Sequence, residues 1–230
     1  MAILYIIGTP IGNLGDMTYR AVEILKTVGL IACEDTRRTV KLLNHFGIQS
    51  PLLSCRAGNE RPAAAKVLSR LNEGKNAAYT SDAGTPGLSD PGALLARLAS
   101  QAGHQVIPVP GASAFAALVS ASGGRDKTII FEGFLSPKTG RRRSRLKTLL
   151  ASGAAFVLYE SPFRILKVLE DLVEFDKERY VCVGREMTKL HEEYLRGSAA
   201  DILAALAEKN GQIGEFSVFV SGNKAGERVN

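Results

Sequence analysis

The residues best suited to bind a ligand gather in one loop, Ser81 to Gly92, which reads SDAGTPGLSDPG. Its glycines let the backbone approach a ligand closely, and its prolines keep the loop rigid. An apolar stretch, 76–80, precedes the loop, and an apolar pattern at helical spacing follows it from Ala93. The loop therefore joins a strand to a helix, which is where open α/β sheets bind ligands. An ordinary turn is the alternative, but a turn needs only two such residues.

Carboxylates with a cation nearby follow several other predicted strands. The charged stretch 34–38 ends one strand, where its acids can either belong to a site or complement the dipole of a helix N-terminus. Each carboxylate can equally be the partner in an ion pair. The candidate charged residues are Asp35, Asp82, Asp90, Glu160, Glu186, Arg37, Arg164, Arg185 and Lys189.

Two further loops are rich in small residues. A short apolar strand, 3–7, runs into the loop 8–13, which matches neither the dinucleotide fingerprint nor a phosphate-binding loop. Another strand, 105–109, runs into the segment 110–114 at the start of a helix. The free N–H groups and small side chains of that segment would admit the edge of a ligand.

A basic tract lies at the start of a predicted helix, 141–150. Cations in the first turn of a helix oppose its macrodipole, and a bound phosphate chain would remove that penalty and release counterions. The alternative is a solvated loop whose charges aid solubility. The candidate contacts with nucleic acid are Lys138, Arg141, Arg142, Arg143 and Arg145. Tyr159, Phe163 and Phe134 are available to stack on a base, with core packing as the alternative.

The composition is that of a globular protein. The chain has 230 residues, a net charge of +6 and 45% hydrophobic residues. It has no apolar run long enough to span a bilayer and no signal peptide. Cys33, Cys55 and Cys182 lack the spacing of a metal site, so we expect free thiols, no metal and a cytoplasmic location. The three histidines form no catalytic or metal pattern, which disfavours hydrolases and metalloenzymes.

The order of elements predicts an α/β chain with two α/β domains, 1–120 and 121–230, divided at the small residues of 120–124. In the first half each of five strands is followed by a helix, which indicates a mostly parallel sheet. The second half has more adjacent strands, which indicates a mixed sheet. The strands are expected at 3–7, 30–33, 51–55, 76–80, 105–109, 128–134, 154–159, 179–183, 192–196 and 216–220. The helices are expected at 18–28, 40–46, 59–71, 93–101, 141–150, 165–175 and 199–208, and a further helix is expected to begin in the segment 110–114.

Five motifs, in order along the chain, resemble the tetrapyrrole methylase superfamily and, within it, the bacterial enzymes that methylate ribosomal RNA. They are GTPIGNL at 8–14, SDAGTP at 81–86 with SDPG at 89–92, PGASA at 110–114, YESP at 159–162 and REMTK at 185–189. Each motif alone is weak, but the combination is specific and covers nearly the whole chain.

The resemblance implies S-adenosylmethionine as methyl donor, bound in a cleft between the two domains. It also implies 2′-O-methylation of a cytidine in the decoding region of 16S rRNA, within the 30S subunit, by a homodimer. The donor contacts that it implies are Pro10, Gly12, Gly84, Thr85, Leu88, Ser113, Ala114, Glu160, Ser161, Arg185, Gly214, Glu215 and Phe216. A tetrapyrrole or other small molecule as substrate, and a binding module without turnover, are the alternatives.

For this reaction a carboxylate would accept the proton of the ribose hydroxyl, and a cation would stabilise the developing oxyanion. Asp35, Asp82 and Glu160 are equal candidates for the first role. Arg37, Arg185 and Lys189 are candidates for the second. The chain has Gly58 and Phe163 where the family often has histidine, and Ala112 where it often has proline. We therefore expect no essential base at either histidine position.

Overall fold

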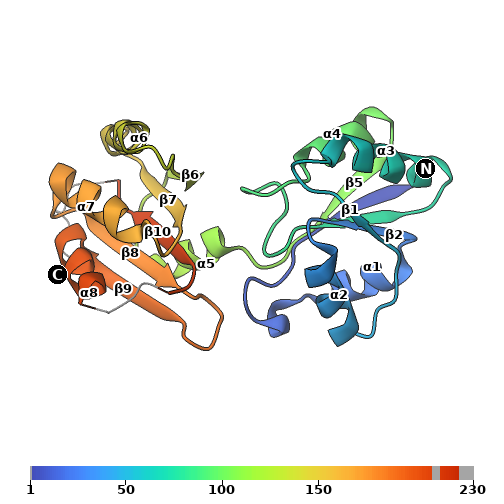
Figure 1. Cartoon of the computed structure of the whole chain (residues 1–230), viewed down its shortest axis with the longest axis horizontal. Coiled ribbons are helices and arrows are strands. Elements are labelled where there is room, and N and C mark those ends of the chain that lie inside the picture. Colours follow the sequence, from blue (N-terminus) through green and yellow to red (C-terminus); the bar gives the residue numbers. More distant parts are fainter. Residues whose placement is uncertain (1, 209–212, 223–230) are drawn as a thin grey trace. The chain divides into compact units, whose positions relative to one another are not determined.

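The computed structural model describes residues 2–208 and 213–222. The chain forms two compact units, Met1–Ser113 and Ala114–Asn230 (Figure 1). The division comes seven residues before the domain boundary that the sequence suggested between residues 120 and 121. That boundary falls inside helix α5 (Ala114–Ser122), which belongs to the second unit.

The first unit contains a five-stranded sheet in which all the neighbouring strands are parallel. The order is β3-β2-β4-β1-β5, so the chain crosses over between most consecutive strands. This confirms the parallel sheet expected from the alternation of strands and helices. The strands are β1 (Ile3–Ile7), β2 (Leu30–Cys33), β3 (Leu52–Ser54), β4 (Ala77–Thr80) and β5 (Gln105–Val109).

Helices cover both faces of this sheet, which is why its central strands read as apolar runs. The helical elements are η1 (Leu14–Asp16), α1 (Tyr19–Thr27), α2 (Thr36–His45), α3 (Glu60–Asn72) and α4 (Ala93–Gln101). Helices α3 and α4 lie on one face of the sheet, and α1 and α2 lie on the other (Figure 1). On β4, Tyr79 packs into the core with α3 and α4, whereas Ala78 packs into the core with α1 and α2. The carboxyl ends of the parallel strands meet at one edge.

Helix α2 begins one turn earlier than expected. The sequence suggested a helix over 40–46, because the apolar positions begin there. In the structure Asp35 caps the helix, and its Oδ1 accepts a hydrogen bond from the backbone N–H of Arg37 at 2.9 Å. An aspartate is a preferred N-cap residue, so the cap outweighs the polar first turn.

The second unit contains a mixed sheet, as predicted, and its strand order is β6-β7-β10-β8-β9. Strands β6 and β7 are parallel, and the other three neighbouring pairs are antiparallel. The strands are β6 (Ile129–Phe134), β7 (Ala155–Glu160), β8 (Tyr180–Arg185), β9 (Glu193–Ser198) and β10 (Phe216–Val220). The remaining helices are α6 (Thr139–Ala151), α7 (Ile165–Asp176) and α8 (Ala199–Ala207).

Candidate functional site

Three loops of the first unit meet at the carboxyl edge of its sheet. The backbones of Thr9 and Gly84 exchange two hydrogen bonds, of 2.9 and 3.0 Å, which join the loop after β1 to the loop after β4. The hydroxyl of Thr85 donates to the carbonyl of Ala112 at 3.2 Å, which joins the second loop to the segment after β5. The three segments that the sequence singled out are therefore neighbours in space.

Glycine is required where two of these loops touch. A Cβ atom on Gly8 would lie 2.9 Å from the Cα of Gly111, and one on Gly111 would lie 2.7 Å from the carbonyl oxygen of Gly8. Distances below 3.0 Å force the backbone to shift. Glycine at both positions therefore lets the two loops pack this closely, and Gly84 adopts a φ of +77° that favours glycine.

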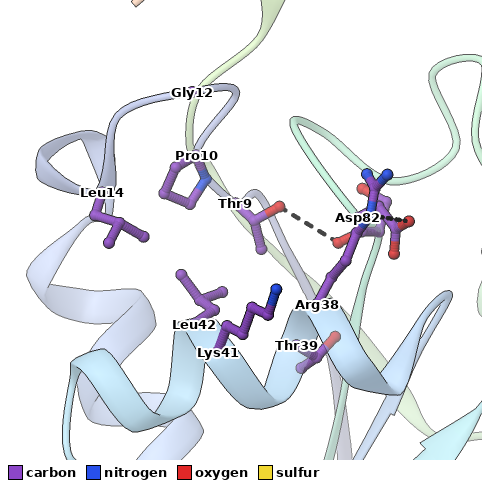
Figure 2. A pocket seen from close by; sticks show the side chains of 10 residues that line it. Thr9, Pro10, Gly12, Leu14, Arg38, Thr39, Lys41, Leu42 and Asp82 are labelled. Atoms are coloured by element: carbon purple, nitrogen blue, oxygen red, sulfur yellow. Dashed lines mark hydrogen bonds and ion pairs between the residues drawn. The ribbon is translucent and has the colours of Figure 1, made fainter. Parts of the chain in front are cut away.

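A cavity of about 230 Å³ lies beside the joined loops. Pro10 and Leu14 line one side, and Arg38 and Asp82 line the other (Figure 2). Further residues of α2 line the cavity between these two sides. The cavity is lined by Thr9, Pro10, Gly12, Leu14, Arg38, Thr39, Lys41, Leu42, Ser81 and Asp82. It combines apolar walls with a few polar groups, as ligand sites usually do.

Asp82 is the central polar residue of this cavity. Its Oδ1 accepts a hydrogen bond from the backbone N–H of Asp35 at 2.9 Å, and its Oδ2 lies 3.5 Å from Nε of Arg38. The side chain is 22% exposed, so it remains accessible to a ligand. Asp82 thereby ties the end of β4 to the start of α2 and contributes to the lining of the cavity.

Asp35 has a different environment. Its two carboxylate oxygens accept hydrogen bonds from Nε and Nη2 of Arg37 at 3.0 and 2.6 Å, in addition to the bond from the Arg37 backbone. These hydrogen bonds hold the pKa of Asp35 well below its usual range. A carboxylate so stabilised in its charged form is a poor proton acceptor.

A third carboxylate stands close by on the loop after β4. Burial raises the pKa of Asp90 to about 6, and the charge of Glu34 adds to the rise. A hydrogen bond with Ser81 acts in the opposite direction, and Asp82 again raises the value. Leu88, in the same loop, forms a backbone hydrogen bond with Thr85 at 3.3 Å. The loop therefore has fixed internal bonds and a net negative charge.

In the second unit, three predicted site residues form one row across the sheet. Phe216 on β10 is opposite Glu160 on β7 and opposite Arg185 on β8. Glu160 is buried, and its Oε1 accepts hydrogen bonds from the backbone N–H of Ser161 at 2.7 Å and from Nε of Arg164 at 2.8 Å. Arg185 donates from Nε to the carbonyl of Ile213 at 2.8 Å.

The loop after β8 is tied to the segment before β10 by charged side chains. Nζ of Lys189 lies 2.8 Å from Oε1 of Glu186 and 3.1 Å from Oε2 of Glu215. Glu186 has a φ of +48°, which is unusual for a residue with a side chain. It packs against Gly214, where a Cβ would lie 2.4 Å from Cγ of Glu186. Such strained positions are often found in functional loops.

The basic tract divides into two groups. Arg142 is buried and its Nε donates to Oδ2 of Asp171 at 2.7 Å. Arg143 contacts Asp171 and Glu174, and Arg145 pairs with Glu132. Lys138 and Arg141 are exposed and have no ion pair within the described part of the chain. Packing and ion pairs thus account for three of the five candidate RNA contacts in this structure.

Sequence reasoning missed the contribution of α2 to the cavity. Lys41 and Leu42 line it together with Arg38 and Thr39, as expected for residues three and four apart on one face of a helix. The signal that could have shown this was Asp35 as an N-cap residue. A helix that starts at Thr36 includes all four positions and places them on one of its faces. Leu14 was also missed, since it lies in η1, beyond the loop 8–13.

Among residues 2–208 and 213–222, no helix has the length and apolar character needed to cross a membrane. Within the same ranges, no group of three or more histidine, cysteine, aspartate or glutamate side chains is arranged to hold a metal ion.

The family model for the tetrapyrrole (corrin/porphyrin) methylases matches residues 3–203. The chain therefore belongs to the tetrapyrrole methylase family. Within it, the chain is similar to proteins named Ribosomal RNA small subunit methyltransferase I. The one from Synechocystis sp. is 47% identical over 223 residues, 96% of this chain and 80% of that protein. The one from Thermotoga maritima is 44% identical over 224 residues, 97% of this chain and 100% of that protein.

Solved structures support the fold. The methyltransferase CobJ superposes with a TM-score of 0.72 at 19% identity, covering 100% of this chain and 98% of that one. The cobalt precorrin-4 methyltransferase CbiF superposes with a TM-score of 0.69 at 18% identity, covering 95% and 94% of the two chains. At these identities the likeness establishes the two-sheet architecture.

Proposed function

We propose that this chain transfers a methyl group from S-adenosylmethionine to the 2′-oxygen of a cytidine in the decoding region of 16S rRNA. The observation with the greatest weight is the 42–47% identity to proteins named for methylation of small-subunit ribosomal RNA. The net charge of +6 favours a polyanionic substrate. The enzyme acts in the cytoplasm, as a homodimer, on RNA within the 30S subunit.

The donor fits the chemistry of the joined loops. The close packing of Gly8 and Gly111 holds together loops rich in small residues, whose main-chain N–H and carbonyl groups suit the polar edges of an adenosine and an amino acid. The nearby carboxylates of Asp82 and Asp90 favour a cationic ligand. The proposed donor contacts are Pro10, Gly12, Gly84, Thr85, Leu88, Ser113, Ala114, Glu160, Ser161, Arg185, Gly214, Glu215 and Phe216.

The size of the cavity separates the donor from the target nucleotide. At about 230 Å³ it is smaller than the roughly 300–1,000 Å³ typical of drug-sized ligands. A single base with its ribose is therefore a better match than a whole S-adenosylmethionine molecule. Arg38 and Lys41 supply cations for the flanking phosphates, and Leu42 and Leu14 supply apolar walls for the base.

Asp82 is the proposed proton acceptor. When bound, S-adenosylmethionine supplies an electrophilic methyl group, and the ribose hydroxyl must lose its proton to attack it. Asp82 lines the cavity and is held by one backbone N–H and by the distant Arg38, whereas arginines engage Asp35 and Glu160 directly. A carboxylate with an accessible oxygen is the better acceptor.

Three cations are the proposed candidates for stabilising the developing oxyanion. Arg37 has an exposed guanidinium that is fixed by Asp35. Arg185 and Lys189 are fixed by Glu193 and by Glu186 with Glu215. A cation already held in place costs little reorganisation when charge develops, which is the condition for effective electrostatic catalysis.

The test is transfer of tritiated methyl groups from S-adenosylmethionine to 30S subunits that lack the modification. Naked 16S rRNA and a tetrapyrrole are the comparison substrates, because the structural relatives include enzymes named for corrin and porphyrin methylation. We expect incorporation into 30S subunits. Incorporation only into the tetrapyrrole would favour the small-molecule reaction, and donor binding without transfer to any of the three would indicate a binding module.

A further inference from the structure

Two large aromatic side chains are exposed at one edge of the second unit. Phe163 is 89% exposed and Phe134 is 58% exposed. Phe134 ends β6, and Phe163 follows the end of β7, the neighbouring parallel strand. Exposed aromatic residues placed together mark interaction surfaces more often than isolated ones do.

The two residues are held by bonds beneath them. Nη1 of Arg164 donates to the carbonyl of Leu135 at 3.3 Å, which ties the residue after Phe163 to the residue after Phe134. The Arg164 guanidinium is also held by the buried Glu160 at 2.7 Å. The ring of Phe134 packs against Tyr159, edge to face, with centroids 5.8 Å apart. The ring of Phe134 and the backbone next to Phe163 are therefore held in place by contacts within the second unit.

The cations next to this edge are not neutralised. Lys138 and Arg141 follow β6 at the start of α6, are exposed, and have no ion pair in the ranges that the structure describes. The nearby Arg145 is balanced by Glu132 at 2.6 Å. The surface thus combines uncovered aromatic rings with net positive charge.

We propose that Phe163 and Phe134, with Lys138 and Arg141, form a platform on which unpaired bases of RNA stack while the cations contact phosphates. We call these four residues the aromatic platform. Single-stranded nucleic acid is bound in this way by aromatic rings flanked by a basic groove, without readout of sequence. The proposal rests on the proposed function, because it gives the RNA substrate a second contact apart from the cavity of the first unit.

Charge distinguishes RNA from a second copy of the chain as the occupant. In a symmetric dimer a patch must be complementary to itself, and the two charged residues of this patch, Lys138 and Arg141, are both cations. Like charges facing each other in an interface are unfavourable, whereas phosphates neutralise them. RNA is therefore the proposed partner of the aromatic platform.

Base stacking is measured with an unstructured oligoribonucleotide that contains 2-aminopurine, whose fluorescence falls when the base stacks on an aromatic ring. The variants are Phe163→Ala, Phe163→Tyr and, as a matched control, Tyr19→Ala, which removes an aromatic residue 93% exposed on the first unit. We expect Phe163→Ala to weaken binding by about 5- to 150-fold, the usual range for loss of one stacked base. Phe163→Tyr should retain the quenching, and Tyr19→Ala should not differ from the wild type.

The salt dependence of the same binding tests the cations. For a single strand, each phosphate contact contributes about −0.7 to the slope of log K against log salt. Replacing Lys138 and Arg141 by alanine should therefore reduce the slope by about 1.4, whereas Lys26→Ala, on the exposed face of α1, should not change it. Equal binding, quenching and slope in all variants would overturn the proposal.

Methyl transfer by the same variants separates this proposal from the proposed function. If the wild type methylates 30S subunits, Phe163→Ala should raise KM, and an unaltered KM would count against the platform. If the wild type methylates no RNA but quenching by Phe163 persists, the function is wrong and the platform stands. A change of oligomeric state in Phe163→Ala, measured by light scattering, with unchanged RNA binding would assign the surface to a second copy and overturn the proposal.

Discussion

The Oδ1 atom of Asp82 lies 2.9 Å from the backbone nitrogen of Asp35, although the two residues are 47 positions apart. This bond joins the loop after β4 to the N-terminus of α2, and the cavity lies between the two. Asp35 is committed to its helix cap and to Arg37, which leaves Asp82 as the carboxylate that faces the cavity. The backbone N–H of Asp35 thus fixes the orientation of the Asp82 carboxylate.

Replacing Asp82 by asparagine should lower kcat by about 100-fold or more, the usual contribution of a general base. Asparagine keeps an oxygen that can accept the bond from Asp35, so the melting temperature should stay close to that of the wild type. Asp16→Asn, an exposed acid in η1, is the control. Wild-type kcat in Asp82→Asn would exclude Asp82 as the proton acceptor.

Gly8→Ala should separate the joined loops. The new methyl group would lie 2.9 Å from Gly111, and relief of such overpacking usually costs about 1–3 kcal/mol. We expect lower stability in urea and weaker binding of S-adenosylmethionine by calorimetry. Gly58→Ala is the matched control, because a Cβ there would meet nothing within 4 Å. Equal donor affinity in both variants would show that the loop junction does not shape the donor site.

Arg142→Ala should destabilise the second unit by about 3 kcal/mol, toward the lower end of the range for breaking a buried ion pair. Asp171 would remain buried, but Arg143 would still contact it at 2.8 Å. Arg141→Ala, the exposed neighbour, should leave the free energy of unfolding nearly unaltered. Urea denaturation measures both. A loss of RNA affinity in Arg142→Ala without loss of stability would instead support the contact that the sequence suggested.

Asp90 should make stability depend on pH. Its pKa is about 6 in the folded chain and about 4 in the unfolded chain, so the folded state binds more protons between these values. Stability attributable to Asp90 therefore falls as pH rises from about 4 to 6. Asp90→Asn should remove this decrease and raise the melting temperature at pH 7.5 more than at pH 4. Equal effects at both pH values would show that the carboxylate is not perturbed.

Much of the first unit could be predicted from sequence, because its signals are local. Alternating strands and helices indicate the parallel sheet, and the glycine-rich loops must gather at one edge once the strands are parallel. The predicted start of α2 was wrong by four residues, because the prediction followed the apolar periodicity and not the Asp35 cap. The contribution of Lys41 and Leu42 to the cavity was lost with it.

Ion pairs between residues far apart in the sequence could not be predicted. Nothing in the sequence near Arg142 indicates that Asp171, 29 residues later, would bury its charge. For Phe163 the sequence left base stacking and core packing as alternatives, because an aromatic residue after a buried strand is usually part of the core. Both depend on where α6 and α7 pack, which local patterns do not determine.

The most direct test of the central claim is mass mapping of 16S rRNA after incubation of 30S subunits with the enzyme and S-adenosylmethionine. We expect one added methyl group, on the ribose of a cytidine in the decoding region, with the adjacent phosphodiester resistant to alkali. A methyl group on a base, at another nucleotide, or on no nucleotide while the enzyme methylates a tetrapyrrole, would contradict the proposed reaction.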